Sequence, residues 1–125
     1  MGYRSEVVLV VGNEVMPQFM VAMAKSPAAR AMCWQDADDR VMNYNGESGS
    51  VLFKWNWIKW YDSYEEIQAI EDFMNWCDSE TIEVHGEEVE ANEYFSFIRI
   101  GEELEDVEQR GYGQWDVHVV RGIEY

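Results

Sequence analysis

A chain of 125 residues has the length of one domain and can bury a hydrophobic core of its own. It is 47% hydrophobic and 14% aromatic, a composition that excludes an intrinsically disordered chain, and no run approaches the roughly 18 apolar residues of a membrane-spanning helix. The formal net charge of −16 at pH 7 repels nucleic acids and anionic membranes, so we expect direct binding to neither.

The first third of the chain predicts one strand and two helical segments. Ser5 to Val11 is short, apolar and β-branched, which is typical of a central strand covered on both faces. A helix follows, which Asn13 would cap and which would hold Pro17 in its first turn. Ser26-Pro27 ends this helix, and residues 28–34 predict a second short one. The expected buried stripe of the first helix is Met16, Phe19, Met20 and Met23.

A β-hairpin is predicted next, after a polar loop over residues 35–39. Arg40 to Tyr44 predicts its first strand, and residues 45–49 (NGESG) have the composition of its turn. The second strand begins at Val51 and alternates in polarity. Its odd-numbered residues are expected to face the core: Val51, Phe53, Trp55, Trp57 and Tyr61.

The segment from Ser63 to Cys77 predicts the best-formed helix. Ser63 and Glu66 have the spacing of a capping box, in which each side chain satisfies a free amide of the first turn. Apolar residues recur at steps of three and four along one face, and polar and acidic residues occupy the other. The expected apolar stripe is Ile67, Ile70, Met74 and Cys77, flanked by Phe73.

The last third predicts three strands separated by acidic segments. Thr81 to His85 predicts a short edge strand, residues 87–93 an acidic loop, and Tyr94 to Ile100 a firm strand. Residues 101–113 are expected to be irregular with a helical turn, and Trp115 to Arg121 to be the final strand. We therefore predict one α+β domain over residues 1–125. Its order of elements is that of a two-layer ferredoxin-like (split βαβ) sandwich, with two helices on one face of a mainly antiparallel sheet and one or two extra strands.

Metal and redox chemistry have little support in the sequence. Cys33 and Cys77 form no Cys-x-x-Cys pair and fit buried thiols in a reducing cytoplasm, where we expect the protein to act. His85 and His118 lie in no zinc-binding pattern, and the acidic runs lack the spacing of a calcium-binding loop. We expect neither a metal nor a cofactor.

Catalytic signatures are also absent from the sequence. Neither a Gly-x-Ser-x-Gly elbow nor a phosphate-binding P-loop motif occurs, and no pair of carboxylates is set apart as an acid and a base. We therefore expect that the chain is not an enzyme. A small enzyme or ligand-binding module with a cleft near Trp60 is kept as an alternative.

The excess negative charge lies in one segment. Residues 62–108 hold 17 acidic side chains and one basic one, Arg99, whereas the rest of the chain holds 8 of each. Five of these acids lie in a loop whose only apolar residues are Leu104 and Val107, so folding gives no evident reason for them. Trp60 and Tyr64 lie off the main buried face and are suited to anchor a partner. The predicted partner-binding residues are Glu102, Glu103, Glu105, Asp106, Glu108, Glu65, Asp72, Trp60 and Tyr64.

Three blocks of the sequence resemble a group of small, acidic, uncharacterised proteins of tailed bacteriophages. They are Gly2–Val7 (GYRSEV), Lys59–Tyr64 (KWYDSY) and Phe97–Glu102 (FIRIGE). The resemblance implies an accessory gene product that acts in the infected bacterial cytoplasm. Small acidic phage proteins often inhibit host DNA-binding enzymes or defence systems, and some imitate the phosphates of DNA.

The leading hypothesis is an accessory protein that binds and inhibits a basic host protein through an acidic surface. DNA mimicry is its narrower form, since duplex DNA carries about one charge per 1.7 Å of axis. The first alternative is a virion or assembly component that forms homo-oligomers through its apolar strand. The acidity can also serve only to keep an aromatic-rich protein soluble.

Overall fold

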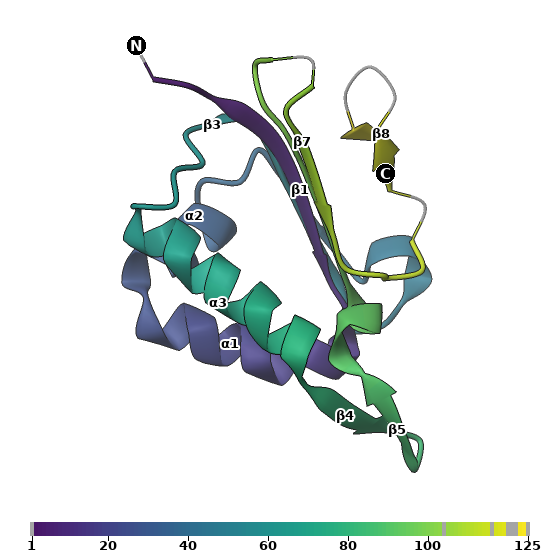
Figure 1. Ribbon diagram of the computed structural model, residues 1–125. Helices are drawn as coiled ribbons and strands as arrows, with labels where there is room; N and C mark the ends of the chain where they lie inside the picture. The colour runs from purple at the N-terminus through teal and green to yellow at the C-terminus, as the bar shows by residue number, and fades with distance from the viewer. Residues whose placement is uncertain (1, 104, 116, 120–122, 125) are drawn as a thin grey trace.

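The computed structural model describes residues 2–103, 105–115, 117–119 and 123–124 of the chain. The described residues form an α+β domain in which three α-helices cover one face of a five-stranded sheet (Figure 1). Neighbouring strands of this sheet are antiparallel throughout, and two small two-stranded sheets lie outside it. The prediction of an α+β domain built on a mainly antiparallel sheet is confirmed.

The strand order of the main sheet is β2-β3-β1-β6-β7. Its strands are β1 (Ser5–Val11), β2 (Asp39–Met42), β3 (Val51–Ile58), β6 (Phe95–Ile100) and β7 (Val107–Arg110). The small sheets pair β4 (Thr81–Val84) with β5 (Glu87–Glu90), and β8 (His118–Val119) with β9 (Ile123–Glu124). The helices are α1 (Met16–Lys25), α2 (Pro27–Trp34) and α3 (Glu65–Ser79), and the 3-10 turns are η1 (Asn13–Val15), η2 (Tyr44–Gly46) and η3 (Ala91–Tyr94).

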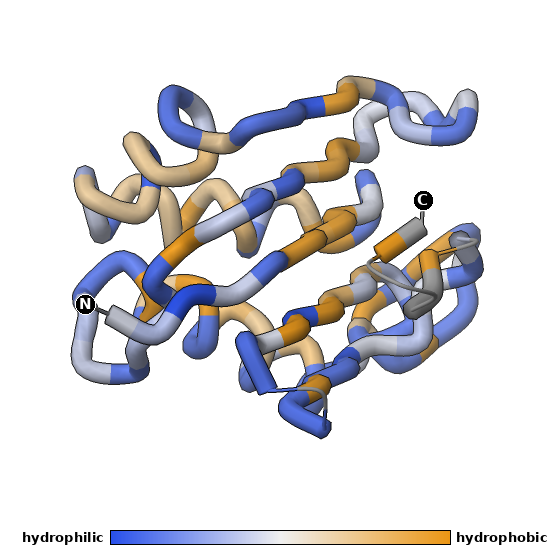
Figure 2. The backbone as a smooth tube through the Cα atoms, turned by 90° about the horizontal axis from the view of Figure 1, so that it is seen from above, coloured by the Kyte–Doolittle hydropathy of each residue, from blue (hydrophilic) through white to orange (hydrophobic). Residues whose placement is uncertain are grey.

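β1 lies at the centre of the sheet, as its apolar sequence predicted. Val7, Leu9 and Val11 point into the core beneath the helices, and Val8 and Val10 point to the opposite face; all five are fully buried. Side chains from η2 and β9 help to cover that opposite face. In Figure 2 the hydrophobic stretches accordingly gather in the middle strands, and hydrophilic residues dominate the outer loops.

One buried charge interrupts the second face of the sheet. Lys54 of β3 is buried and forms an ion pair with Glu6 of β1. The same carboxylate oxygen, Glu6 Oε2, accepts a hydrogen bond from the backbone N–H of Ile123 at 3.2 Å. A buried ammonium needs a partner to stay charged. Glu6 therefore neutralises Lys54 and also ties β9 to the main sheet.

The hairpin of β2 and β3 is confirmed, but β3 carries a bulge that changes which residues face the core. Val7 pairs with Trp55 and Ser5 pairs with Ile58, so two steps along β1 match three steps along β3. The extra residue reverses the alternation. Ile58 packs against the core, Trp60 is only 7% exposed, and Trp57 is 59% exposed. The predictions that Trp57 faces the core and that Trp60 lies off the buried face are therefore wrong.

The predicted apolar stripe of α3 is confirmed, but the predicted cap is wrong. The helix begins at Glu65, and no side chain caps its first turn. Ser63 lies in the preceding turn, where the N–H of Tyr64 donates to the carbonyl of Tyr61 at 3.0 Å. This turn holds Ser63 too early in the chain to reach the free amides of the helix. The buried residues of α3 are Ile67, Ile70, Phe73, Met74 and Cys77.

The first two helices meet at Ser26. Its Oγ accepts a hydrogen bond from the N–H of Ala29 at 3.1 Å and so caps α2, the helix predicted over residues 28–34. Asn13 does not cap α1, because it is the first residue of η1 and the cap position of α1 falls on Val15. The expected stripe of α1 is correct for Phe19 and Met23, which are buried, whereas Met20 is 46% exposed.

The short strand predicted over Thr81–His85 is confirmed as β4, but the segment 87–93 is not the predicted acidic loop. β4 pairs with β5 in a separate hairpin, and η3 follows. The hairpin turn is His85-Gly86, whose φ angles of 52° and 81° are both positive, as a two-residue turn of type I′ requires. The sequence did not indicate a strand over residues 87–90, because three of these four residues are glutamates and only Val89 is apolar.

The C-terminal part contains a strand that the sequence pattern did not indicate. β7 lies at the edge of the sheet within the segment expected to be irregular, and pairs with β6. The final strand predicted over 115–121 is described only at His118–Val119, where it pairs with β9; residues 116, 120 and 121 lie outside the described residues.

Cys33 and Cys77 are buried free thiols as predicted, and burial raises the pKa of each to about 12.

No helix within the described residues is long and apolar enough to cross a membrane.

Candidate functional site

The turn between β6 and β7 is organised by Arg99. This guanidinium donates to Asp106 at 2.8 and 3.1 Å, to Glu108 at 3.2 Å and to the hydroxyl of Ser5 at 3.2 Å. The Tyr3 hydroxyl donates to Asp106 Oδ2 at 2.6 Å. Hydrogen bonds from Arg99 and then from Tyr3 lower the pKa of Asp106 to about 2.

The same turn explains a glycine of the FIRIGE block. A Cβ added at Gly101 would collide with the Asp106 carboxylate and the Tyr3 hydroxyl, so only glycine allows these groups to approach. Glu102 also contributes to the turn, because its Oε2 accepts from the N–H of Arg4 at 2.7 Å. The expectation that folding has no need of the acids in this loop is therefore wrong for Asp106, Glu108 and Glu102.

A second arginine fastens β7 to α3. Arg110 donates to Glu71 at 2.8 Å, to Asp78 at 2.6 Å and to Asn75 at 3.0 Å. Burial raises the pKa of Glu71, and the nearby Glu108 charge raises it further, while Arg110 lowers it. The opposing shifts mean that Glu71 sits among charges of its own sign in spite of its ion pair.

A pocket lies between these two arginine clusters, beside Trp60. Its volume is about 470 Å³, and its walls carry three aromatic rings, four carboxylates and the Arg99 guanidinium. The carboxylates are Asp62, Glu71, Asp106 and Glu108. Of the predicted partner-binding residues, Trp60, Asp106 and Glu108 are thus brought together. Trp60 forms part of the wall instead of projecting to a partner.

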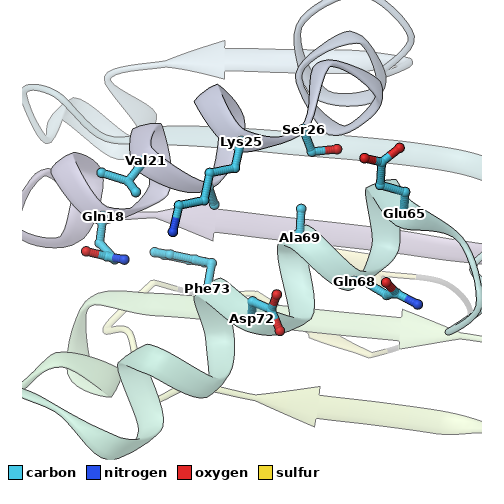
Figure 3. A pocket seen from close by; sticks show the side chains of 10 residues that line it. Gln18, Val21, Lys25, Ser26, Glu65, Gln68, Ala69, Asp72 and Phe73 are labelled. Carbon is cyan, nitrogen blue, oxygen red and sulfur yellow. The ribbon is translucent and has the colours of Figure 1, made fainter.

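Glu65 and Asp72 lie in a different place. Together they line a groove of about 210 Å³ between α1 and α3 (Figure 3). Lys25 extends from α1 into this groove, and Phe73 lines it from α3. The presence of Lys25 offsets part of the negative charge. The structure therefore does not join these two helix acids and the 102–105 turn into one pocket.

Tyr64 lines a third pocket, of about 400 Å³, with the exposed indole of Trp57. Arg4 and Lys59 contribute positive charge to its lining, and Asp36, Asp38 and Glu66 contribute negative charge. Trp57 is thus exposed, although the alternation of polarity in its strand predicts that it faces the core. The bulge in β3 turns Trp57 to the surface, and the alternation of polar and apolar residues in the sequence does not reveal this bulge.

The β4–β5 hairpin carries exposed acids that are not among the predicted partner-binding residues. Glu83 stands directly opposite Glu88 in the ladder, and both side chains are exposed. The Thr81 hydroxyl donates to Glu88 Oε1 at 2.8 Å, which does not neutralise the charge. Like charges facing each other across a hairpin destabilise it. Figure 1 shows that this hairpin follows α3 and projects from the end of the domain opposite the β6–β7 turn.

Most of the acids in the segment 62–108 lack a cation. Four of the seventeen form ion pairs, namely Glu71, Asp78, Asp106 and Glu108. The other thirteen form none with any described residue. We call these thirteen the unpaired acids; they are Asp62, Glu65, Glu66, Asp72, Glu80, Glu83, Glu87, Glu88, Glu90, Glu93, Glu102, Glu103 and Glu105. Within the described part of the chain, no three His, Cys, Asp or Glu side chains are grouped so as to hold a metal ion.

Comparison with known proteins identified no relative of this chain. No family model matches the chain, no curated protein sequence matches it, and no solved structure matches it.

Proposed function

We propose that this chain is a non-enzymatic protein that binds a basic protein through its unpaired acids. The observation that carries the proposal is the β4–β5 hairpin, where Glu83 faces Glu88 and no described cation neutralises either. An arrangement that costs stability within the chain is compensated when a partner supplies the cations. Complementary charge also speeds the encounter of two proteins.

The unpaired acids fall at three places that a partner can reach. Three lie in the β6–β7 turn, four lie from Asp62 to Asp72 at the start of α3 and along it, and six lie from Glu80 to Glu93 around the β4–β5 hairpin. All but Glu66 are exposed. The turn and the hairpin lie at opposite ends of the domain (Figure 1), so a partner must cover α3 and both ends of the domain to meet all three groups.

Within this proposal, the partner is a DNA-binding or defence protein of a bacterial host, and the chain is a phage accessory protein that inhibits it. The three sequence blocks that resemble phage proteins support this assignment by analogy. DNA mimicry is the narrowest form of the proposal, in which the unpaired acids occupy the sites of DNA phosphates. Competition by duplex DNA for the partner tests that form.

We further propose that the architecture is ferredoxin-like with an added edge strand. The order β2-β3-β1-β6 supports this, because α1 and α2 connect β1 to β2 and α3 connects β3 to β6 across an intervening antiparallel strand. Two such split βαβ units define that arrangement. β7 is then the strand added at the edge.

The alternative is a homo-oligomer assembled through the apolar strand β1, but this strand has no exposed edge or apolar face for such an interface. β1 is paired on both edges, and the side chains of Val7 to Val11 are fully buried. A protein-binding role through the acids needs no such surface.

A pull-down from bacterial lysate tests the proposed function. We expect the chain to recover a basic protein at low salt and to lose it as salt rises, because screening weakens exposed charges. Two triple variants then map the interface: Glu102→Gln with Glu103→Gln and Glu105→Gln, and Glu83→Gln with Glu87→Gln and Glu88→Gln.

Each variant removes three charges and is the control for the other, since both have the same net charge. We expect at least one of them to slow association and reduce its salt dependence. Unchanged association rates and salt slopes in both variants would show that the acids serve solubility alone.

A further inference from the structure

Helix α1 is apolar on its exposed side as well as on its buried side. Its sequence, MPQFMVAMAK, contains only two polar side chains, Gln18 and Lys25, and its buried residues are Phe19 and Met23. The exposed apolar residues recur at steps of three and four and so form one stripe, which we call the outer stripe of α1. They are Pro17, Met20, Val21 and Ala24. A helix that is apolar all round is normally covered on every side, whereas the described residues leave this stripe exposed.

The outer stripe borders the groove between α1 and α3 (Figure 3). Val21 belongs to both and is 43% exposed, and Met20 beside it is 46% exposed. Ala22, Ala69 and Phe73 give the groove apolar walls. Its volume of about 210 Å³ is below the range of about 300 to 1,000 Å³ that is typical of small-molecule pockets. The groove is therefore better suited to an inserted side chain of another protein than to a free small molecule.

The charges around the groove are of opposite sign on its two sides. Glu65 and Asp72 line it from α3, and Lys25 lines it from α1. None of the three forms an ion pair with a described residue. Glu65 and Asp72 lie about two turns, or about 10 Å, apart on the same side of α3. A helix placed in the groove would thus meet two acids along one flank and one base along the other.

We infer that an amphipathic helix of the partner protein docks on the outer stripe of α1 and along the α1–α3 groove; this inference rests on the proposed function and names the segment of the partner that binds. An apolar side chain of that helix enters the groove between Val21 and Ala69. Two basic side chains, about two turns apart on one flank of the helix, meet Glu65 and Asp72. Amphipathic helices bind grooves in this way, through apolar anchors at steps of three, four and seven residues.

Charge selects this occupant among the apolar surfaces that could cover the stripe. A second copy of the chain brings another net charge of −16, and an anionic lipid surface is repelled in the same way. A basic helix is attracted by the two acids and covers the outer stripe with its own apolar face. Lys25 repels a base on its side of the groove. The partner helix therefore carries its bases on the flank that faces α3.

Nuclear magnetic resonance of the full chain tests the inference with three synthetic alanine-based peptides of about 18 residues, long enough to form isolated helices. The first peptide carries leucines at steps of three and four on one face and lysines along one flank of that face. The second has glutamate for each lysine, and the third has alanine for each leucine. We expect the first peptide to shift the methyl resonances of Ala22 and Ala69 saturably, with a dissociation constant below about 1 mM, and the other two to bind at least about tenfold more weakly.

Matched variants separate the groove from the rest of the surface at constant charge. Ala69→Gln fills the groove and should weaken binding of the first peptide about tenfold. Ala31→Gln is the control, because Ala31 has a similar partial exposure on α2 and lies outside the groove. Val21→Gln, at an exposed residue, remains informative if Ala69→Gln perturbs the fold. Equal affinities in Ala69→Gln and Ala31→Gln, with Val21→Gln unchanged as well, would overturn the inference.

Charge variants test the two flanks of the groove. Glu65→Gln with Asp72→Asn should weaken binding of the first peptide, whereas Glu103→Gln with Glu105→Gln removes two charges from the β6–β7 turn and should have little effect. Lys25→Gln should strengthen binding. An equal loss in the two double variants would mean that the peptide responds to net charge alone, which would overturn the choice of a basic helix for this groove.

Analytical ultracentrifugation of the chain alone tests the other occupant. We expect a monomer, because the outer stripe awaits a partner of opposite charge. A concentration-dependent dimer that Val21→Gln abolishes would show that a second copy covers the stripe, and it would overturn the partner helix.

The failure of this inference is distinguishable from the failure of the proposed function. Should the lysate partner bind Ala69→Gln and Val21→Gln as it binds the wild type, with the expected salt dependence, the acidic interface stands and the groove falls. Should the first peptide occupy the groove while no basic partner is recovered, the groove stands as a helix-binding surface and the proposed function falls.

Discussion

Ser26 and Ser63 both precede a helix, but only Ser26 caps one. The Oγ of Ser26 accepts from the N–H of Ala29, whereas no side chain caps α3. We expect Ser26→Ala to lower the free energy of unfolding by about 1 kcal/mol through the lost cap. Ser63→Ala is the control and should change it by less than about 0.5 kcal/mol. Urea denaturation followed by tryptophan fluorescence measures both, and an equal loss in the two variants would place a cap at Ser63 after all.

Asp106 couples the stability of the β6–β7 turn to pH. Its pKa is lowered from 3.8 to about 2 in the folded chain by Arg99 and Tyr3. A carboxylate with a lowered folded-state pKa stabilises the protein above its unfolded pKa, and loses that effect as pH falls through the folded one. Asp106→Asn should therefore be less stable than the wild type at pH 5 to 7, and the difference should shrink from about pH 4 to about pH 2.

Glu105→Gln is the matched control for this experiment. It removes the same charge from the same turn, but Glu105 forms no ion pair with a described residue. It should not lower stability at pH 7. A loss as large as that of Asp106→Asn would mean that net charge, and not the contact with Arg99, explains the effect.

At the scale of the elements, the long regular patterns were predictable, whereas the irregular ones were not. β1 and the stripe of α3 follow from local periodicity, which is what a sequence encodes most directly. The bulge in β3 depends on its pairing with β1, a long-range contact that alternation cannot contain. The same limit applies to the site. The composition shows that the segment 62–108 is acidic, but it does not show which of its acids form ion pairs. Those pairs are made by Arg99 and Arg110 through tertiary contacts.

The β4–β5 hairpin offers a test of turn geometry on its own. Gly86 has a φ of 81°, and a Cβ there would meet no atom within 4 Å, so a side chain would cost only backbone strain. We expect Gly86→Ala to destabilise the hairpin by about 1 kcal/mol. His85→Gly is the opposite change at a φ of 52° and should not destabilise it.

Amide hydrogen exchange reads out this test element by element. Protection of the β4 and β5 amides should fall in Gly86→Ala while protection of β1 at the centre of the main sheet changes little, because the hairpin pairs with no strand of that sheet. Equal losses in both places would show that the hairpin unfolds only with the whole domain.

At the scale of the whole molecule, repulsion among the unpaired acids opposes folding. The net charge is −16, and thirteen acids of the segment 62–108 have no ion pair with a described residue. Salt screens this repulsion, and it also screens the few ion pairs at the surface. Exposed ion pairs are typically worth less than about 1 kcal/mol each. The repulsion therefore dominates the response of the folded state to salt.

We expect the melting temperature to rise when sodium chloride is raised from about 0.01 M to about 0.1 M, because the Debye length falls from about 30 Å to about 10 Å. Glu83→Gln with Glu87→Gln and Glu88→Gln should melt at a higher temperature than the wild type at low salt and should gain less from added salt. Those three charges face one another or lie side by side in the hairpin, so their removal takes away part of what salt would have screened. A melting temperature that falls as salt rises would mean that the arginine clusters at Arg99 and Arg110 outweigh the repulsion, and the unpaired acids would then carry no measurable cost for a partner to relieve.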